Sequence, residues 1–348
     1  MKRRHFLKTL AAGSSVGFAA GSRLLAGEPS AKVSMGLVIG SLSRSPHART
    51  AYDFLEYCSS LGAGGIQIGL DSIEPGYLDK LRRRSSELGM YLEVMVDLPQ
   101  GDDFADFERH VAAARQAGAQ CLRSACINGR RYENFNGLDQ WKKFVAESEH
   151  RVAQAVPILE KYRLPLGLEN HKDWTLEEMI ALLQRHASAY LGVCLDTGNN
   201  MALLDDPREV VSKLAPFAVT THFKDMAVKE YPQGFLLADV PLGRGMLDLP
   251  WIVDCIRKRR PRARLNLEAH IRDPLQVPCL TDKYWSTFPE RSGLYVARTL
   301  TLAREHPPRE PLAYVSQLNE EEQRRLEEVN VKQCLAYAGE RLGLRPAS

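Results

Sequence analysis

The chain has 348 residues and a mass of 39.0 kDa, which is long enough to bury a large core. Its hydrophobic content of 44% and charged content of 26% are ordinary for a globular enzyme. The formal net charge of +3 is too small to indicate a protein that binds nucleic acid, and part of it comes from basic residues near the N-terminus.

The first 31 residues are predicted to be a twin-arginine export signal. A basic segment, residues 2–8 (KRRHFLK), precedes a weakly apolar stretch rich in Gly and Ala that is too short for a good membrane span. Cleavage near Ala26 and near Ala31 both remain open, and a disordered basic terminus is the alternative interpretation. We therefore expect a periplasmic or otherwise exported protein that uses the twin-arginine export machinery, with no stable membrane insertion after cleavage.

Strand-like and helix-like segments alternate from Lys32 onward. The predicted strands are 33–39, 65–70, 90–96, 120–124, 166–169, 191–195, 217–221 and 263–267. The predicted helices are 48–61, 77–88, 104–117, 138–162, 175–186, 207–214, 250–259 and 294–304. Eight repeats over about 270 residues predict an α/β fold, a (β/α)8 TIM barrel. A doubly wound open sheet is the competing fold, but no Gly-rich phosphate-binding fingerprint follows the first strand.

The predicted domains are the leader 1–31, the barrel 32–310 and a helical tail 311–348 that packs on the outside of the barrel or on a second subunit. Residues 229–247 are interpreted as an insertion. The segment 271–289, with Tyr284, Trp285 and Phe288, is either a lid over the site or a packing flap. The seven cysteines include no CxxC pair and lie mostly in apolar runs, which indicates small buried side chains rather than a disulfide framework.

Four successive predicted strands end in a residue that can bind a metal ion. Glu169, Asp196 and His222 follow one another at intervals of 27 and 26 residues (196 − 169 and 222 − 196), about one strand and one helix per step. Glu268 ends the next strand after the insertion. Parallel strands of a barrel present their carboxyl ends at one face, so we expect these four side chains to meet there.

Three carboxylates and one imidazole suit a hard or borderline divalent ion. We expect one such ion, with Mn²⁺ preferred and Mg²⁺, Co²⁺ or Zn²⁺ as alternatives. The carboxylates would repel one another strongly without a cation. A single Glu at the end of a strand is most often a surface residue or a salt-bridge partner. Four ligand-type residues at the same end of successive strands make that alternative much weaker.

Several neighbouring residues are candidates for substrate binding. These are His171, Asn199, Lys224, His270 and Arg123. Strand alternation places Lys224 and the residue that follows it on opposite sides, so only one of the two can face the site. A rim salt bridge is the alternative role for Lys224, and a structural role is the alternative for Arg123 and for Gln67 on the second predicted strand.

The motifs Glu-Asn-His, Leu-Asp-Thr-Gly-Asn, His-Phe-Lys-Asp and Asn-Leu-Glu, in this order, resemble those of the xylose isomerase-like TIM barrel superfamily. That group includes sugar phosphate isomerases and epimerases, ketose 3-epimerases, inosose dehydratases and, more distantly, endonuclease IV. The resemblance implies that Glu169, Asp196, His222 and Glu268 bind the metal and that the two glutamates exchange protons with the substrate. Asn199 stands where those epimerases have a His, which argues against a simple ketose 3-epimerase.

The expected function is a metal-dependent isomerase or epimerase that acts on a keto sugar or sugar derivative through an enediolate, with Glu169 and Glu268 as acid and base. A lyase, a dehydratase or an enzyme that cleaves 3-keto-glycosides is the alternative, because each can use the same enediolate. A non-catalytic sugar-binding barrel is a second alternative. The expected partner is a small carbohydrate, without nucleic acid, and a homodimer is compatible with the resemblance. Export favours a free or glycosidic sugar over a sugar phosphate.

Overall fold

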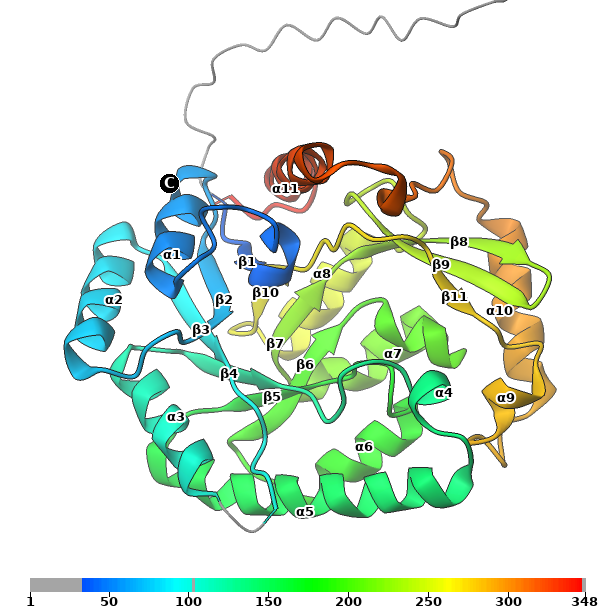
Figure 1. Ribbon diagram of the computed structural model, residues 1–348, viewed down its shortest axis with the longest axis horizontal. Coiled ribbons are helices and arrows are strands. Elements are labelled where there is room, and N and C mark those ends of the chain that lie inside the picture. The colour runs from blue at the N-terminus through cyan, green and yellow to red at the C-terminus, as the bar shows by residue number, and fades with distance from the viewer. Residues whose placement is uncertain (1–32, 102–103, 346–348) are drawn as a thin grey trace, which may run out of the picture.

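The computed structural model describes residues 33–101 and 104–345, and the predicted leader lies outside these residues. Eight parallel strands close into a barrel in the order β1-β10-β7-β6-β5-β4-β3-β2 (Figure 1). Their bounds are β1 Gly36–Val38, β2 Gly65–Gly69, β3 Tyr91–Met95, β4 Cys121–Ser124, β5 Leu166–Glu169, β6 Leu191–Asp196, β7 Ala218–Phe223 and β10 Arg264–Leu267. The predicted (β/α)8 barrel is therefore confirmed, and the alternative of an open sheet is wrong.

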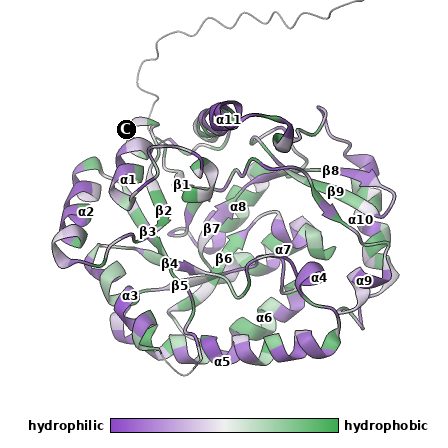
Figure 2. Cartoon of the chain, viewed as in Figure 1, coloured by the Kyte–Doolittle hydropathy of each residue, from purple (hydrophilic) through white to green (hydrophobic). Residues whose placement is uncertain are grey.

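Helices cover the outside of the barrel. They are α1 Ala51–Ser60, α2 Pro75–Leu88, α3 Ala105–Gln116, α4 Arg131–Asn134, α5 Leu138–Tyr162, α6 Leu176–Arg185, α7 Pro207–Leu214, α8 Leu249–Arg259, α9 Asp282–Trp285, α10 Gly293–Glu305 and α11 Glu320–Arg341. Figure 2 shows hydrophobic residues along the strands and hydrophilic stretches on outer helices such as α2 and α5. This distribution is expected where each helix buries one face against a parallel sheet.

The segment inserted after β7 forms a second, smaller sheet. Strands β8 (Asp225–Tyr231) and β9 (Gly234–Val240) pair as an antiparallel hairpin, and β11 (Leu275–Val277) adds to β9. This sheet lies beside the barrel together with α9 and α10 (Figure 1). The aromatic side chains of Tyr284 and Phe288 are buried in the core beneath it, so the segment 271–289 packs as a flap.

The C-terminal helix α11 packs on its own barrel. Val331, Leu335 and Ala338 are buried in the main core, and the Glu327 carboxylate accepts a hydrogen bond from the Ser43 hydroxyl and pairs with Arg44 at 2.9 Å. All seven cysteines are free, and six of them are buried. Within the described residues, none of the helices is both long enough and apolar enough to span a membrane.

Candidate metal centre

The four predicted ligands meet at the carboxyl-terminal face of the barrel. Glu169 ends β5, Asp196 ends β6, His222 is the penultimate residue of β7, and Glu268 directly follows β10. Each offers a ligand atom, and these atoms lie within 4.8 Å of one another. Strand register produces this arrangement, since Asp196 pairs with His222 across β6 and β7, and the backbone N–H of Glu268 donates to the carbonyl of Phe223 at 3.0 Å.

The donor set fits a divalent ion. All four residues are buried. The His222 Nδ1 atom lies 3.2 Å from Glu169 Oε2 and 3.0 Å from Glu268 Oε1, yet it makes no hydrogen bond of good geometry, and neither does Asp196 Oδ2. Buried polar atoms normally have partners. A divalent ion among three carboxylates and one imidazole would supply the missing partner.

The barrel interior fixes the orientation of His222. Its Nε2–H donates to Gln67 Oε1 at 2.6 Å, which turns Nδ1 toward the other ligands. The Gln67 amide in turn donates to Glu93 Oε2 at 2.9 Å, and Thr220 and Asn266 donate to the same oxygen at 2.6 and 2.8 Å. Gln67 is therefore a positioning residue directly below the ligands, although its sequence context predicted only a weak candidate.

Protein cations already pair with the ligand carboxylates. Arg123 Nε donates to Glu169 Oε2 at 2.7 Å, and Lys224 Nζ lies 2.8 Å from Asp196 Oδ2 and also pairs with Glu268. Burial alone would raise the pKa of Glu169, but Arg123 and then His222 lower it well below its usual range. Arg123 thus lies against a ligand, and Lys224 faces the site. Asp225 faces away from it and accepts hydrogen bonds from backbone N–H groups of the loop that follows β9.

The remaining predicted substrate residues line the same region. The Asn199 amide donates to Glu169 Oε1 at 2.9 Å. His270 Nε2 lies 3.4 Å from Glu268 Oε1, and about a third of its side chain is exposed (34%). A Cβ at Gly40 would lie 2.3 Å from the His270 ring, so glycine there makes room for it. His171 is half-buried, and its Nδ1 has no hydrogen-bond partner among the residues that the structure describes. Burial lowers the pKa of His171 to about 3, which keeps the ring neutral.

Three charged residues of the site were not predicted. Lys172, which directly follows the Glu-Asn-His motif at the end of β5, is buried and donates to Asn199 Oδ1. Asp239 on β9 pairs with Arg272 of the flap at 2.7 Å and lies 3.8 Å from Lys224 Nζ. Lys172 could have been predicted from its place next to the Glu-Asn-His motif. No local pattern in the sequence indicated Asp239 or Arg272, which belong to the small sheet and to the flap.

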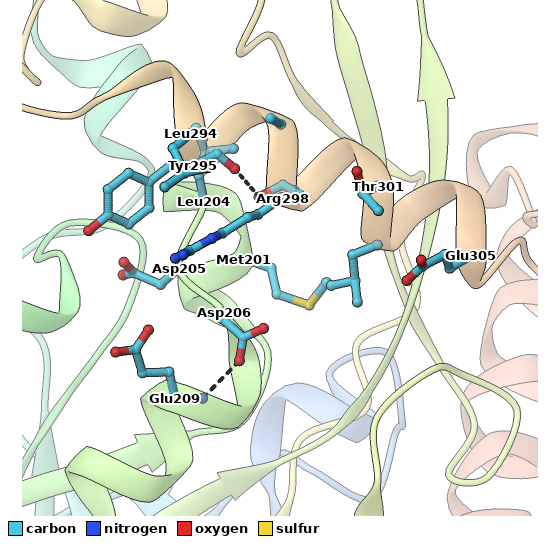
Figure 3. A pocket seen from close by; sticks show the side chains of 13 residues that line it. Met201, Leu204, Asp205, Asp206, Glu209, Leu294, Tyr295, Arg298, Thr301 and Glu305 are labelled. Atoms are coloured by element: carbon cyan, nitrogen blue, oxygen red, sulfur yellow. Dashed lines mark hydrogen bonds between the residues drawn. The ribbon is translucent and has the colours of Figure 1, made fainter.

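The cavities outside the ligand cluster include one beside α10 and one beside α11. One of about 410 Å³ separates α10 from the segment that leads into α7, and side chains such as Met201, Leu294 and Arg298 line it (Figure 3). None of the four ligands reaches it. Another, of about 300 Å³, lies between the β8–β9 hairpin and α11 and is bordered by Asp239 and Arg272, so it adjoins the charged rim of the site.

Comparisons with known proteins agree with this fold. Residues 55–283 match the family described as xylose isomerase-like TIM barrel. A 3-oxo-isoapionate decarboxylase of Pectobacterium atrosepticum is 30% identical over 221 residues, which is 62% of this chain and 76% of that protein.

Solved structures share the fold at lower identity. A xylose isomerase-like TIM barrel protein from Mycobacterium smegmatis, in complex with magnesium, has a TM-score of 0.55 and 16% identity, over 77% of this chain and 97% of that one. The 3-keto-D-glucoside 4-epimerase of E. coli has a TM-score of 0.54 and 11% identity, over 79% and 100%. At these identities the likeness concerns the fold.

Proposed function

Because the chain belongs to the xylose isomerase-like TIM barrel family, we propose that it is a divalent-metal-dependent enzyme that epimerises or isomerises a keto sugar or sugar derivative. The observation that carries this proposal is the buried cluster of Glu169, Asp196, His222 and Glu268 at the mouth of the barrel. The ion that best suits three carboxylate oxygens and one imidazole nitrogen is Mn²⁺, with Mg²⁺, Co²⁺ and Zn²⁺ as alternatives.

The ligands would also serve the chemistry. When bound, a divalent ion supplies Lewis-acid polarisation of a ketone and so favours loss of the adjacent proton. Glu169 and Glu268 approach the cluster from different strands, and both are kept ionised, since Arg123 and His222 lower the pKa of one and His222 and Lys224 that of the other, although burial opposes both shifts. One glutamate takes the proton and the other returns one, to the opposite face for epimerisation or to the neighbouring carbon for isomerisation.

The neighbouring side chains would orient the sugar. His171 presents a neutral ring whose buried Nδ1 has no partner, and His270 is the more exposed of the two histidines. Lys224 holds its ammonium between two ligand carboxylates, where it can stabilise negative charge on a substrate oxygen. These roles for His171, His270 and Lys224, and substrate contacts of Asn199 and Arg123, are part of the proposal.

A decarboxylase is the second candidate, favoured by the relative that is named as a 3-oxo-isoapionate decarboxylase. Loss of carbon dioxide from a 3-oxo acid leaves its electron pair on the carbon beside the ketone, which is the same enolate that proton removal gives. The four ligands suit both reactions equally. Product analysis therefore decides between them.

The test begins with the mature protein purified without chelator. Bound metal is measured by elemental analysis, and the protein is incubated in D₂O with a panel of ketoses, 3-keto-glycosides and 3-oxo sugar acids while NMR follows C–H exchange and products. Stoichiometric metal with exchange and a new epimer or isomer supports the proposal, whereas release of carbon dioxide supports the decarboxylase. Metal with sugar binding but no exchange would indicate a binding barrel, and absence of metal would remove the basis of the proposal.

Two variants test the glutamates. Glu169→Gln and Glu268→Gln should slow exchange strongly even in preparations that retain metal, because the amide cannot accept a proton. Full turnover in either metal-loaded variant would show that its side chain is only a ligand. Export through the twin-arginine machinery and assembly as a homodimer remain proposals from sequence, to be tested by fractionation and by sedimentation.

A further inference from the structure

Lys172 is a buried cation without an anionic partner. It follows the β5 motif, its side chain is 4% exposed, and its ammonium donates to Asn199 Oδ1. Among the residues that the structure describes, it makes no ion pair with a carboxylate. A charge that is buried without a counterion costs much more free energy than one that is paired, so this position requires a reason.

The other three cations of the site are all paired. Arg123 pairs with Glu169, Lys224 with both Asp196 and Glu268, and Arg272 with Asp239. Once Lys172 is included, these four carboxylates match four cations in number, leaving aside His222, whose raised pKa makes it a further cation in the absence of metal. A divalent ion at the ligand cluster leaves the metal-loaded site with a surplus of two positive charges.

Lys172 and Lys224 converge on the same neutral oxygen. Lys224 Nζ lies 3.5 Å from Asn199 Oδ1, to which Lys172 also donates. Burial and then the charges of Lys224 and Arg272 lower the pKa of Lys172 to about 8. Two ammonium groups held this close make a position that attracts an anion.

We propose that Lys172, assisted by Lys224, binds a carboxylate group of the substrate, so that the enzyme acts on an anionic keto sugar acid. This inference rests on the proposed function, because it assumes a sugar bound at the metal. The substrate carboxylate would give the buried ammonium its missing counterion, and a charge-assisted hydrogen bond of this kind is among the stronger polar contacts.

The surroundings favour a carboxylate over a phosphate. A phosphate usually binds to several backbone N–H groups, as at a helix N-terminus. In the turn that carries Asn199, the N–H groups of Gly198 and Asn199 both already donate to Asp196 Oδ1 at 2.8 Å. One unpaired ammonium matches one negative charge, so a monocarboxylate is the ligand that the site fits.

The experiment compares two ligands of similar size, 2-keto-D-gluconate and D-fructose, on metal-loaded protein by calorimetry. Wild-type protein should bind the acid about ten-fold or more tightly than the neutral sugar. Lys172→Met, which keeps a long side chain without charge, should bring this ratio close to one, and Lys172→Arg should preserve a preference for the acid. Circular dichroism and metal content check that both variants fold and load.

The outcomes separate this inference from the proposed function. No preference for the acid in wild-type protein, no measurable binding of the acid, or an unchanged preference in Lys172→Met would each overturn the carboxylate subsite. Tighter binding of D-fructose 6-phosphate than of the acid would also overturn it and identify a phosphate site. A preference for the acid without C–H exchange on any sugar would support the carboxylate subsite and refute enolisation. C–H exchange without a preference for the acid would support enolisation and refute the subsite.

Discussion

Gln67 offers a direct test of how the barrel interior supports the metal. Its Oε1 accepts the Nε2–H of His222 at 2.6 Å, and its amide donates to Glu93. Gln67→Leu keeps the approximate size and removes both contacts. Leaving the buried imidazole N–H without an acceptor should cost about 1–3 kcal/mol of stability. Loss of the group that orients a metal-binding His should lower the metal affinity about 10–100-fold.

The assay measures two quantities. The Kd for Mn²⁺ comes from competition with a fluorescent chelator, and the free energy of unfolding comes from urea denaturation of chelator-treated protein. Gln276→Leu is the matched control, because Gln276 lies on strand β11 with its side chain exposed. If Gln67→Leu binds metal with wild-type affinity, the hydrogen bond from His222 to Gln67 is not needed to orient His222 as a ligand.

Three further predictions concern metal, pH and the flap. Chelation should destabilise the protein, and Mn²⁺ at 100 times its Kd should restore about 2.7 kcal/mol in urea denaturation; no change would argue against the site. Surrounding charges outweigh burial and raise the pKa of His222 well above 6.5 in the absence of metal. The stabilisation by its proton is therefore complete below pH 6.5 and is lost as pH rises through the higher pKa of the folded protein, so the Tm increase caused by metal should grow from pH 6 to pH 8 rather than shrink. Arg131→Met should lose about 2–3 kcal/mol of stability but keep the wild-type Kd for metal. The Arg131 guanidinium lies 3.6 Å from the centre of the Trp141 ring, 4.1 Å from that of the Phe288 ring and 2.7 Å from the Glu178 carboxylate, and it contacts none of the four ligands. A changed Kd for metal would contradict this separation.

The barrel and its ligands were predictable because both follow from local patterns. Each strand is a short apolar run, and α5 and α7 have the predicted bounds, with α5 continuing through Pro157. The four ligands follow from one rule, that a parallel barrel gathers the carboxyl ends of its strands at one face. A residue placed by its position at a strand end can be found without knowledge of tertiary contacts.

The small sheet and the outer charges of the site were not predictable in this way. β9 and the end of β8 lie in the segment 229–247 that was interpreted as an insertion, and β11 joins them from beyond the last barrel strand. The Asp239–Arg272 pair forms only when that sheet assembles beside the barrel. Lys172 could be seen beside its motif, but its lack of a counterion is a property of the folded site.

Cations of the protein reduce the repulsion among the ligand carboxylates that the sequence predicts. Each of the three ligand carboxylates already has a cationic partner without a metal ion, since Arg123 pairs with Glu169 and Lys224 pairs with both Asp196 and Glu268. Glu268 directs Oε1 toward His222 Nδ1 and Oε2 toward Lys224, so a metal can take one oxygen while the lysine keeps the other. Asp196 has no such division, since backbone N–H groups occupy Oδ1 and only Oδ2 faces Lys224. A metal ion and Lys224 would therefore compete for Asp196 Oδ2. When the metal is bound, the Lys224 ammonium should interact less with Asp196 and more with negative charge on the substrate.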